Sequence, residues 1–306
     1  MTLFPDEAAL DAEDARRLVA TQAPQWADLP LTPAGAGTDN QMFRLGDELL
    51  VRLPRRPGTA EDVAKEQTWL PRLGPLLPLE VPAPVFHGRP DERYPFDWSV
   101  YRWIEGAEPT ADNVADWADF GDRLADFVQH LHALDTMGAT RTGSLAWYRG
   151  KRLHEFAEEG WGTIDRLRAR AALGVFDGTD LDLDAVAALW RTALEVDDPV
   201  LPDGWLHGDL RAANLLVREG RLVAAIDFGV LGLGNPTAEH AAIWEFPAAA
   251  RTAYRNRLGL DEATWQRARG WKLFVAGQAL DYYWERWPEL ARDNLVTVHR
   301  LLHETD

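Results

Sequence analysis

Apolar and polar positions follow two different patterns along this chain, and the change lies near Gly106. Before it, short apolar segments bounded by Gly, Pro, Asn and Asp predict β-strands joined by turns. The expected strands cover residues 41–45, 49–53, 81–87 and 98–103, and the expected helices cover residues 6–21 and 60–72. A small-residue loop at 31–40 leads into the first strand pair. This part therefore predicts a small antiparallel sheet with one helix between its strand pairs.

The second expected helix carries its own local signals. Thr59 is the expected N-cap, because a hydroxyl there accepts from the free amides of the first turn. Glu61 and Lys65 have the i,i+4 spacing of a favourable ion pair.

After Gly106 the apolar residues recur every three or four positions, which predicts amphipathic helices. In the first such segment they are Val114, Trp117, Phe120, Leu124, Phe127, Val128, Leu131 and Leu134. Similar patterns cover residues 148–173, 184–195, 261–286 and 288–304. We therefore expect an α+β protein of two lobes, a small antiparallel-sheet lobe at residues 1–103 and a mostly helical lobe at residues 104–306.

Composition narrows the classes of partner. The formal charge of −17 over 306 residues argues against nucleic acid and anionic membranes, because both bind basic patches. The acid excess at 104–203 is either a solvated surface or an attraction for a polycationic substrate. The chain has no cysteine, no apolar run long enough to span a bilayer and no signal-peptide pattern at its start. We expect a soluble cytoplasmic protein, a monomer or homodimer.

The segment His207-Gly208-Asp209-Leu210-Arg211-Ala212-Ala213-Asn214 carries the strongest chemical signal, with Ile226-Asp227-Phe228-Gly229 eighteen residues after the first aspartate. In the kinase pattern the first Asp accepts the proton of the substrate hydroxyl, and the Asn and second Asp hold the metal that bridges the phosphates. Two apolar runs around Arg218-Glu219-Gly220-Arg221 predict a β-hairpin between Asn214 and Asp227. Oxygen ligands at adjacent strand ends suit Mg²⁺.

A second group of residues points to nucleotide phosphates. The loop 34–40, with Gly35, Gly37 and Thr38, has the small residues that let backbone amides approach an anion, although a flexible turn has the same composition. Arg52 lies in the middle of an apolar strand and needs a partner or a ligand. Glu66 on the next helix is the expected partner; the alternative is an outward-facing Arg52 on a half-exposed strand.

On these residues the chain resembles the aminoglycoside phosphotransferases, small-molecule and antibiotic kinases with a protein-kinase-like fold. It is similar to an actinobacterial branch with a Gly-Ala-Gly-Thr-Asp-Asn loop and a Val-Arg-Leu-Pro strand end, over residues 30 to 285. The resemblance implies that Asp209 is the catalytic base and that Asn214 and Asp227 bind Mg²⁺. It also implies that Arg52 and Glu66 orient the phosphates and that the backbone near Arg102 and Ile104 binds the purine of ATP or GTP.

Several positions depart from the family pattern. Arg52 replaces the usual Lys, and Arg211 replaces the His of many relatives in this branch. Asn235 and Glu239 follow where the family has Asp residues, and we expect them to shape the loop rather than bind metal. Tyr101 either gates the purine pocket, which leaves GTP acceptable, or simply fills the core.

The acceptor side is less clearly marked. Acids interleaved with aromatic residues at 277–287 indicate recognition of a cationic or sugar-bearing ligand, with Asp281 and Glu285 as the candidate acids. Trp161 and Trp244-Glu245 are further candidates, although aromatic residues at helical spacing are commonly core. The hypothesis is transfer of the γ-phosphate of a Mg-nucleotide to a hydroxyl of a cationic small molecule, an aminoglycoside-like or other antibiotic. The alternatives are a kinase of a cellular metabolite (an amino sugar, a choline-like alcohol or homoserine) and a nucleotide-binding pseudokinase scaffold.

Overall fold

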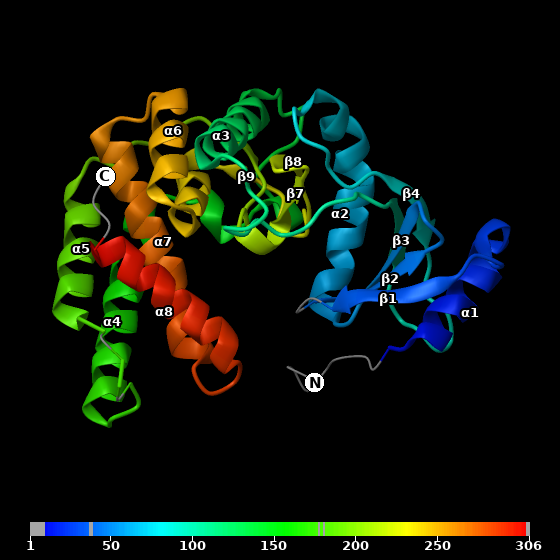
Figure 1. The fold of residues 1–306 in the computed structure, drawn as a ribbon, viewed down its shortest axis with the longest axis horizontal. Helices are drawn as coiled ribbons and strands as arrows, with labels where there is room; N and C mark the ends of the chain where they lie inside the picture. The colour runs from blue at the N-terminus through cyan, green and yellow to red at the C-terminus, as the bar shows by residue number, and fades with distance from the viewer. Residues whose placement is uncertain (1–9, 37–38, 177, 180, 304–306) are drawn as a thin grey trace. The chain divides into compact units, whose positions relative to one another are not determined.

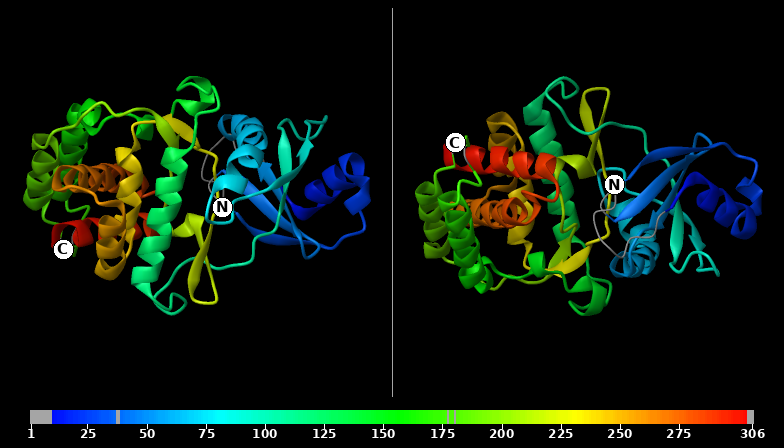
Figure 2. Two further views of the ribbon diagram at one scale, coloured as in Figure 1. Left: turned by 90° about the horizontal axis from the view of Figure 1, so that it is seen from above. Right: turned by 90° about the horizontal axis from the view of Figure 1, so that it is seen from below.

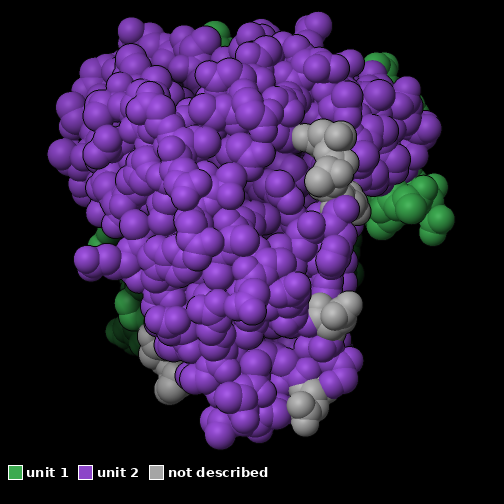
Figure 3. Space-filling view, turned by 90° about the vertical axis from the view of Figure 1, so that its left-hand side faces the viewer, with its two compact units in different colours: residues 1–113, 213–231 green, residues 114–212, 232–306 purple. Residues whose placement is uncertain are grey.

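The computed structural model describes residues 10–36, 39–176, 178–179 and 181–303, and these form two compact units (Figures 1 and 3). Unit 1 comprises residues 1–113 and 213–231, and unit 2 comprises residues 114–212 and 232–306. The hairpin expected in the second lobe groups with unit 1, because Glu80 forms a bridge with Ala224, and Ala107 with Val217. Contacts distant in sequence thus set a division that differs from a single cut near residue 103.

Unit 1 is built on a five-stranded antiparallel sheet with the strand order β1-β2-β3-β5-β4. Its strands are β1 (Leu31–Ala36), β2 (Asn40–Leu45), β3 (Leu49–Pro54), β4 (Pro84–Gly88) and β5 (Trp98–Arg102). The four expected strands are present, whereas the segment expected as a loop at 31–40 supplies the edge strand β1. Pro33 is tolerated there because an edge strand needs only one row of hydrogen bonds.

Two helices complete this sheet. Helix α1 (Ala12–Gln22) begins at the N-cap Asp11, whose side chain accepts from the amides of Glu13 and Asp14. Its residues Leu18 and Val19 join a core cluster with Val51, Trp98 and other buried residues of the sheet. Helix α2 (Pro57–Leu73) packs on β3, β4 and β5, and it lies along the sheet in Figures 1 and 2.

The predicted N-cap of α2 was wrong by three residues. Pro57 occupies the first turn, where its missing amide costs nothing, so the helix begins after Arg56. The Thr59 hydroxyl lies inside that turn and donates to the carbonyl of Arg56 at 3.0 Å. The ion pair of Lys65 is formed with Asp62, at 3.1 Å and i,i+3 spacing.

The predicted hairpin is confirmed as β7 (Leu215–Arg218) and β8 (Arg221–Ala225). The register pairs Arg218 with Arg221, so only Glu219 and Gly220 form the turn. Both have positive φ, 52° and 81°, which is the requirement of a type I′ turn. The ladder therefore brings the two ends of the hairpin side by side.

Unit 2 is mainly helical, and the fold class predicted from the sequence is confirmed. Its helices are α3 (Trp117–Ala133), α4 (Ala157–Ala172), α5 (Leu183–Glu195), α6 (Ala248–Leu258), α7 (Glu262–Tyr283) and α8 (Pro288–His303). Helix α7 packs against α4, α5 and α8, an arrangement that Figures 1 and 2 both show. A two-stranded sheet of β6 (Gly204–Leu206) and β9 (Gly232–Gly234) completes the unit.

Short 3₁₀ segments connect these elements. They are η1 (Pro24–Trp26), η2 (Gly74–Leu76), η3 (Gly143–Leu145), η4 (Tyr148–Gly150), η5 (Leu153–Phe156), η6 (Ala212–Asn214) and η7 (Pro236–Glu245). Within the described ranges, every helix is too short or too polar to cross a lipid bilayer.

Candidate active site

The hairpin of unit 1 brings the two segments that carry the predicted magnesium ligands side by side. Leu215 pairs with Ala225, and the amide of Ile226 donates to the carbonyl of Asn214 at 2.8 Å. Asn214 is buried, whereas the side chain of Asp227 is 49% exposed. One amide oxygen and one carboxylate are hard ligands, which fits Mg²⁺, an ion that takes few protein ligands and keeps water and phosphate oxygens. Among the residues that the structure describes, no group of three or more His, Asp or Glu is assembled for a metal.

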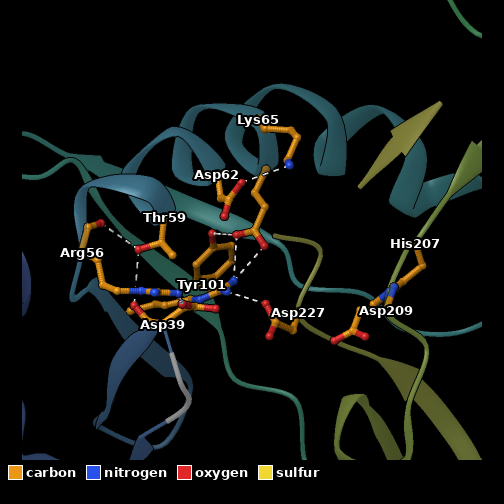
Figure 4. A network of polar contacts seen from close by, with 11 residues as sticks. Asp39, Arg56, Thr59, Asp62, Lys65, Tyr101, His207, Asp209 and Asp227 are labelled. Atoms are coloured by element: carbon orange, nitrogen blue, oxygen red, sulfur yellow. Dashed lines mark hydrogen bonds and ion pairs between the residues drawn. The ribbon is translucent and has the colours of Figure 1, made fainter. Parts of the chain in front are cut away.

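Arg52 belongs to a polar network of the same unit, in which Tyr101 and Asp227 are labelled in Figure 4. Its Nη1 donates to both carboxylate oxygens of Glu66, at 2.8 and 3.0 Å, and its Nη2 contacts Asp227 Oδ1 at 2.5 Å. With its amide oriented to satisfy both groups, Asn40 accepts from Arg52 Nη2 at 2.8 Å and from Nε at 3.1 Å. The predicted Arg52–Glu66 contact is therefore present, and the outward-facing alternative is excluded because the Arg52 side chain is only 12% exposed.

Charge keeps this buried guanidinium protonated. Burial alone would lower the pKa of Arg52, but Glu66 and Asp227 outweigh it and the pKa lies well above its usual value. Tyr101 is buried and its hydroxyl donates to Glu66, and burial together with that carboxylate raises the pKa of Tyr101. Tyr101 is thus part of the Arg52 network.

The predicted phosphate loop is only partly described. Gly35 lies in β1, one residue before the strand ends, and has a φ of 103°. Gly37 and Thr38 lie outside the described residues. Where the chain is described again, Asp39 is tied to the start of α2: it pairs with Arg56, and its carbonyl accepts from the amide of Arg55 at 2.8 Å (Figure 4). The C-terminal end of the loop is therefore anchored.

At the predicted hinge, the two backbone positions differ. The amide of Arg102 is used within the sheet, because it donates to the carbonyl of Ala83 at 2.9 Å. The amide of Ile104 has no hydrogen-bond partner within the described part of the chain. Ile104 is thus the better suited of the two to donate a hydrogen bond to a purine.

Asp209, the predicted base, follows β6 in unit 2. Gly208 has a φ of 82°, a conformation that glycine adopts without strain, and it turns the chain between the buried His207 and Asp209. The amide of Asp209 donates to His207 Nδ1 at 3.2 Å, and both residues are labelled in Figure 4. The pairing of β6 with β9 fixes the strand from which this loop emerges.

Arg149 contacts the predicted base, and nothing in the sequence indicated it. Its Nη1 donates to Asp209 Oδ1 at 2.7 Å and to the carbonyl of Gly208 at 2.6 Å. Burial alone would raise the pKa of Asp209, but Arg149, Arg211 and His207 outweigh it and the pKa lies below its usual value. Asp209 is therefore an anion at neutral pH, the form that a base requires.

Glu239 accepts hydrogen bonds from the backbone of the loop that carries Asp209. Its carboxylate accepts from the amide of His207 at 2.6 Å and from the amide of Gly208 at 3.2 Å. Burial raises the pKa of Glu239 to about 7. Asn235 caps η7 by accepting from the amide of Thr237 at 3.0 Å. These contacts agree with the expectation that both residues shape the loop.

The acids predicted for the acceptor are engaged in ion pairs. Asp281 accepts from Arg166 Nε at 2.6 Å and from Arg170 Nε at 2.9 Å, and Glu285 accepts from Arg170 Nη1 at 2.9 Å. These pairs join α7 and the segment after it to α4.

The other acceptor candidates also have internal partners. Glu245 pairs with Lys272 and accepts from the amide of Ala212 at 2.7 Å, and Trp244 is buried. Trp161 lies under the guanidinium of Arg191. A cavity of about 20 Å³ between α4, α5 and α7 is lined by apolar residues such as Ile164 and Leu273, and it is too small for a sugar ring.

Comparison with known proteins decides the family. Residues 30–271 match the family described as phosphotransferase enzymes, APH, which is well over half of the chain. This chain belongs to the phosphotransferase enzyme family. The match includes the hairpin, Arg52, Glu66 and Asp209.

Individual relatives of this phosphotransferase family member are distant in sequence. An aminoglycoside 3'-phosphotransferase of Escherichia coli is 23% identical over 216 residues, covering 66% of this chain and 71% of that protein. An uncharacterised protein of Mycobacterium tuberculosis is 27% identical over 241 residues; the match covers 76% of this chain but only 43% of the relative's length.

Solved structures agree on the fold. The GDP complex of aminoglycoside 2'-phosphotransferase IIIa superposes with a TM-score of 0.71 at 16% identity, covering 95% of this chain and 98% of that chain. A macrolide 2'-phosphotransferase of Brachybacterium faecium gives a TM-score of 0.60 at 21% identity, with 96% and 99% covered. The family member described here therefore shares the fold of antibiotic kinases.

Proposed function

We propose that this protein transfers the γ-phosphate of a Mg-nucleotide to a hydroxyl group of a small molecule. The observation that carries the proposal is Asp209, held by Arg149 shortly after β6, in a chain whose hairpin brings the segments of Asn214 and Asp227 side by side. Family membership and the fold shared with small-molecule kinases support it.

In unit 1, the side chains fit the nucleotide. Arg52 carries a charge that is fixed by Glu66 and suited to phosphate oxygens, and its present contact with Asp227 would give way when the nucleotide binds. Asn214 and Asp227 would hold Mg²⁺, which when bound neutralises charge on the phosphates. The amide of Ile104 would donate to the purine.

In unit 2, Asp209 would act as the base. The acceptor hydroxyl gives its proton to the Asp209 carboxylate as its oxygen bonds to the γ-phosphorus. The bond from that phosphorus to the bridging oxygen breaks, and the nucleoside diphosphate leaves. Positioning and charge neutralisation supply most of the rate in such transfers.

For the donor we propose ATP or GTP, since the related structures include GDP and ATP complexes. For the acceptor we propose an antibiotic of the aminoglycoside or macrolide type. Relatives with this fold include proteins in complex with kanamycin and gentamicin and a macrolide 2'-phosphotransferase.

The test is nucleotide turnover across a panel of aminoglycosides, macrolides and amino sugars, with ATP and GTP in parallel. We expect acceptor-dependent release of the nucleoside diphosphate and its loss, by a factor of at least about 10², in Asp209→Ala. Nucleotide affinity should stay nearly unchanged in that variant. Turnover within a few-fold of the parent would remove Asp209 from the role of base. Absence of turnover with every acceptor would count against the antibiotic assignment.

A further inference from the structure

The segment that carries Arg149 is fixed to the sheet from which Asp209 emerges. Arg149 lies in η4, and the carbonyl of the next residue, Gly150, accepts from the amide of Asn235 at 2.7 Å and from Arg141 Nη1 at 2.9 Å. A Cβ atom on Gly234 would lie 2.3 Å from the Cα of Gly150, so only glycine allows this approach. Since β9 ends at Gly234 and pairs with β6, the sheet sets the positions of both η4 and the Asp209 loop.

The guanidinium itself is held at three points. Nε donates to the hydroxyl of Tyr148 at 3.1 Å, while Nη1 donates to the carbonyl of Gly208 and to Asp209 Oδ1. Its side chain is 20% exposed and that of Asp209 is 34% exposed, so water screens the pair only in part. An arginine with this many anchors fixes the orientation of a carboxylate better than a mobile surface cation does.

We propose that Arg149 is a positioning residue for the base: it holds the Asp209 carboxylate as an anion and in one orientation, through Oδ1. This inference rests on the proposed function, and it assigns a role to a residue sixty positions before the base. Because Arg149 acts through Asp209, its loss changes the protonation and placement of that carboxylate and leaves the groups of unit 1 intact.

The charged groups around Asp209 determine the direction in which its pKa should change when Arg149 is removed. Arg149, Arg211 and His207 lower the pKa of Asp209, while burial raises it. Removing Arg149 leaves burial less opposed, so Asp209 should take up its proton at higher pH. The acid limb of kcat/KM should move to higher pH with it.

The first experiment titrates the ¹³Cγ resonance of Asp209 in the full chain, without nucleotide or metal, assigned by comparison with Asp209→Asn. In Arg149→Met the resonance should titrate at higher pH than in the parent. Arg149→Lys should show a smaller shift in the same direction, and Tyr148→Phe only a slight one. The control is Arg257→Met, which removes a surface pair with Asp126 of the same 2.7 Å length and should change nothing. An Asp209 titration that is identical in the parent and in Arg149→Met would overturn the proposal. If Arg149→Met does not fold, Arg149→Lys and Tyr148→Phe decide by the same criterion.

The second readout is kinetic. With an acceptor from the panel, kcat of Arg149→Met should fall roughly tenfold or more, a part of what a positioned base contributes, with the nucleotide KM unchanged. A parent protein that turns over no acceptor of the panel would count against the proposed antibiotic acceptor, and the carboxyl titration would still decide the role of Arg149. A large rise in nucleotide KM with an unmoved acid limb would show a structural role and contradict the proposal.

Discussion

At the scale of single residues, Arg52 differs from a lysine in the number of groups it holds at once. Its planar fork reaches Glu66 from Nη1, Asp227 from Nη2, and Asn40 from Nη2 and Nε. An ammonium group is a single point charge, and it cannot span these partners in the same geometry. The arginine that departs from the family's usual lysine is therefore fitted to its surroundings.

Arg52→Lys tests that fit. We expect the nucleotide KM to rise about tenfold, because an ammonium group cannot make the bidentate contact of a guanidinium with phosphate and one hydrogen bond between charged groups is worth roughly 1.5–3 kcal/mol. Steady-state kinetics with varied Mg-nucleotide measures it. Arg218→Lys, which alters an exposed pair with Glu80 in the same unit, is the matched control. Equal KM values for Arg52→Lys and the parent would contradict the assignment.

At the scale of elements, the β7–β8 hairpin contains a local strain that can be removed. Glu219 has a φ of 52°, and the left-handed conformation costs a side-chain residue roughly 1–2 kcal/mol. Asparagine tolerates it better and is preferred with glycine in type I′ turns. Glu219→Asn should therefore raise the melting temperature by about 1–3 °C without a change in turnover. Glu219→Ala, which keeps the strain, should give no gain; a gain of equal size there would disprove the explanation.

The helices and strands differ in how far the sequence could predict them. The hairpin and the long helices α5, α7 and α8 follow from local patterns, and they lie where they were expected. Strand β1 was not predicted, because Pro33 and Gly35 suggest a loop and the strand is defined by its pairing with β2. Helix α6 was not predicted, because it contains few apolar residues. It packs on α3, where Gly121 allows a close approach to Ala250.

The candidate site divides in the same way. Motif spacing indicated Asp209, Asn214 and Asp227, and a charge in an apolar strand indicated Arg52. The contact of Arg149 with Asp209 depends on a close approach of Gly150 to Gly234, which no local pattern encodes. Likewise, the sequence indicated Asp281 as an acceptor residue, whereas its ion pairs with two arginines of α4 depend on the packing of α7, which no local pattern encodes.

At the scale of the whole molecule, buried titratable groups make stability depend on pH in two directions. Glu239 has a pKa raised to about 7, so its contribution is fully present below about 4.5 and is lost as the pH rises through about 7. His132 and His240 act oppositely. Burial lowers their pKa values to about 3 and about 4, so their contribution is present above about 6.5 and lost as the pH falls.

The two histidines lie close together in the core of unit 2, so acid should unfold the protein through them. Their ring centroids are 5.6 Å apart, and His240 is hydrogen-bonded to the Tyr254 hydroxyl at 2.9 Å. For His240 alone, the free energy of unfolding should fall by roughly 2–3 kcal/mol between pH 7 and pH 4.5, because the unfolded chain binds the proton more tightly. Urea denaturation of the parent and of His240→Gln at the two pH values measures this loss as a difference, because the opposing contribution of Glu239 is common to both proteins.

His240→Gln should be less stable than the parent at pH 7, because the buried tyrosine hydroxyl loses its fitted partner, but it should lose less stability on acidification. The matched control is His130→Gln, an exposed histidine on the same helix as His132, which should keep the parent's full pH dependence. If His240→Gln and the parent lost equal stability between pH 7 and pH 4.5, the acid sensitivity would have to come from other groups.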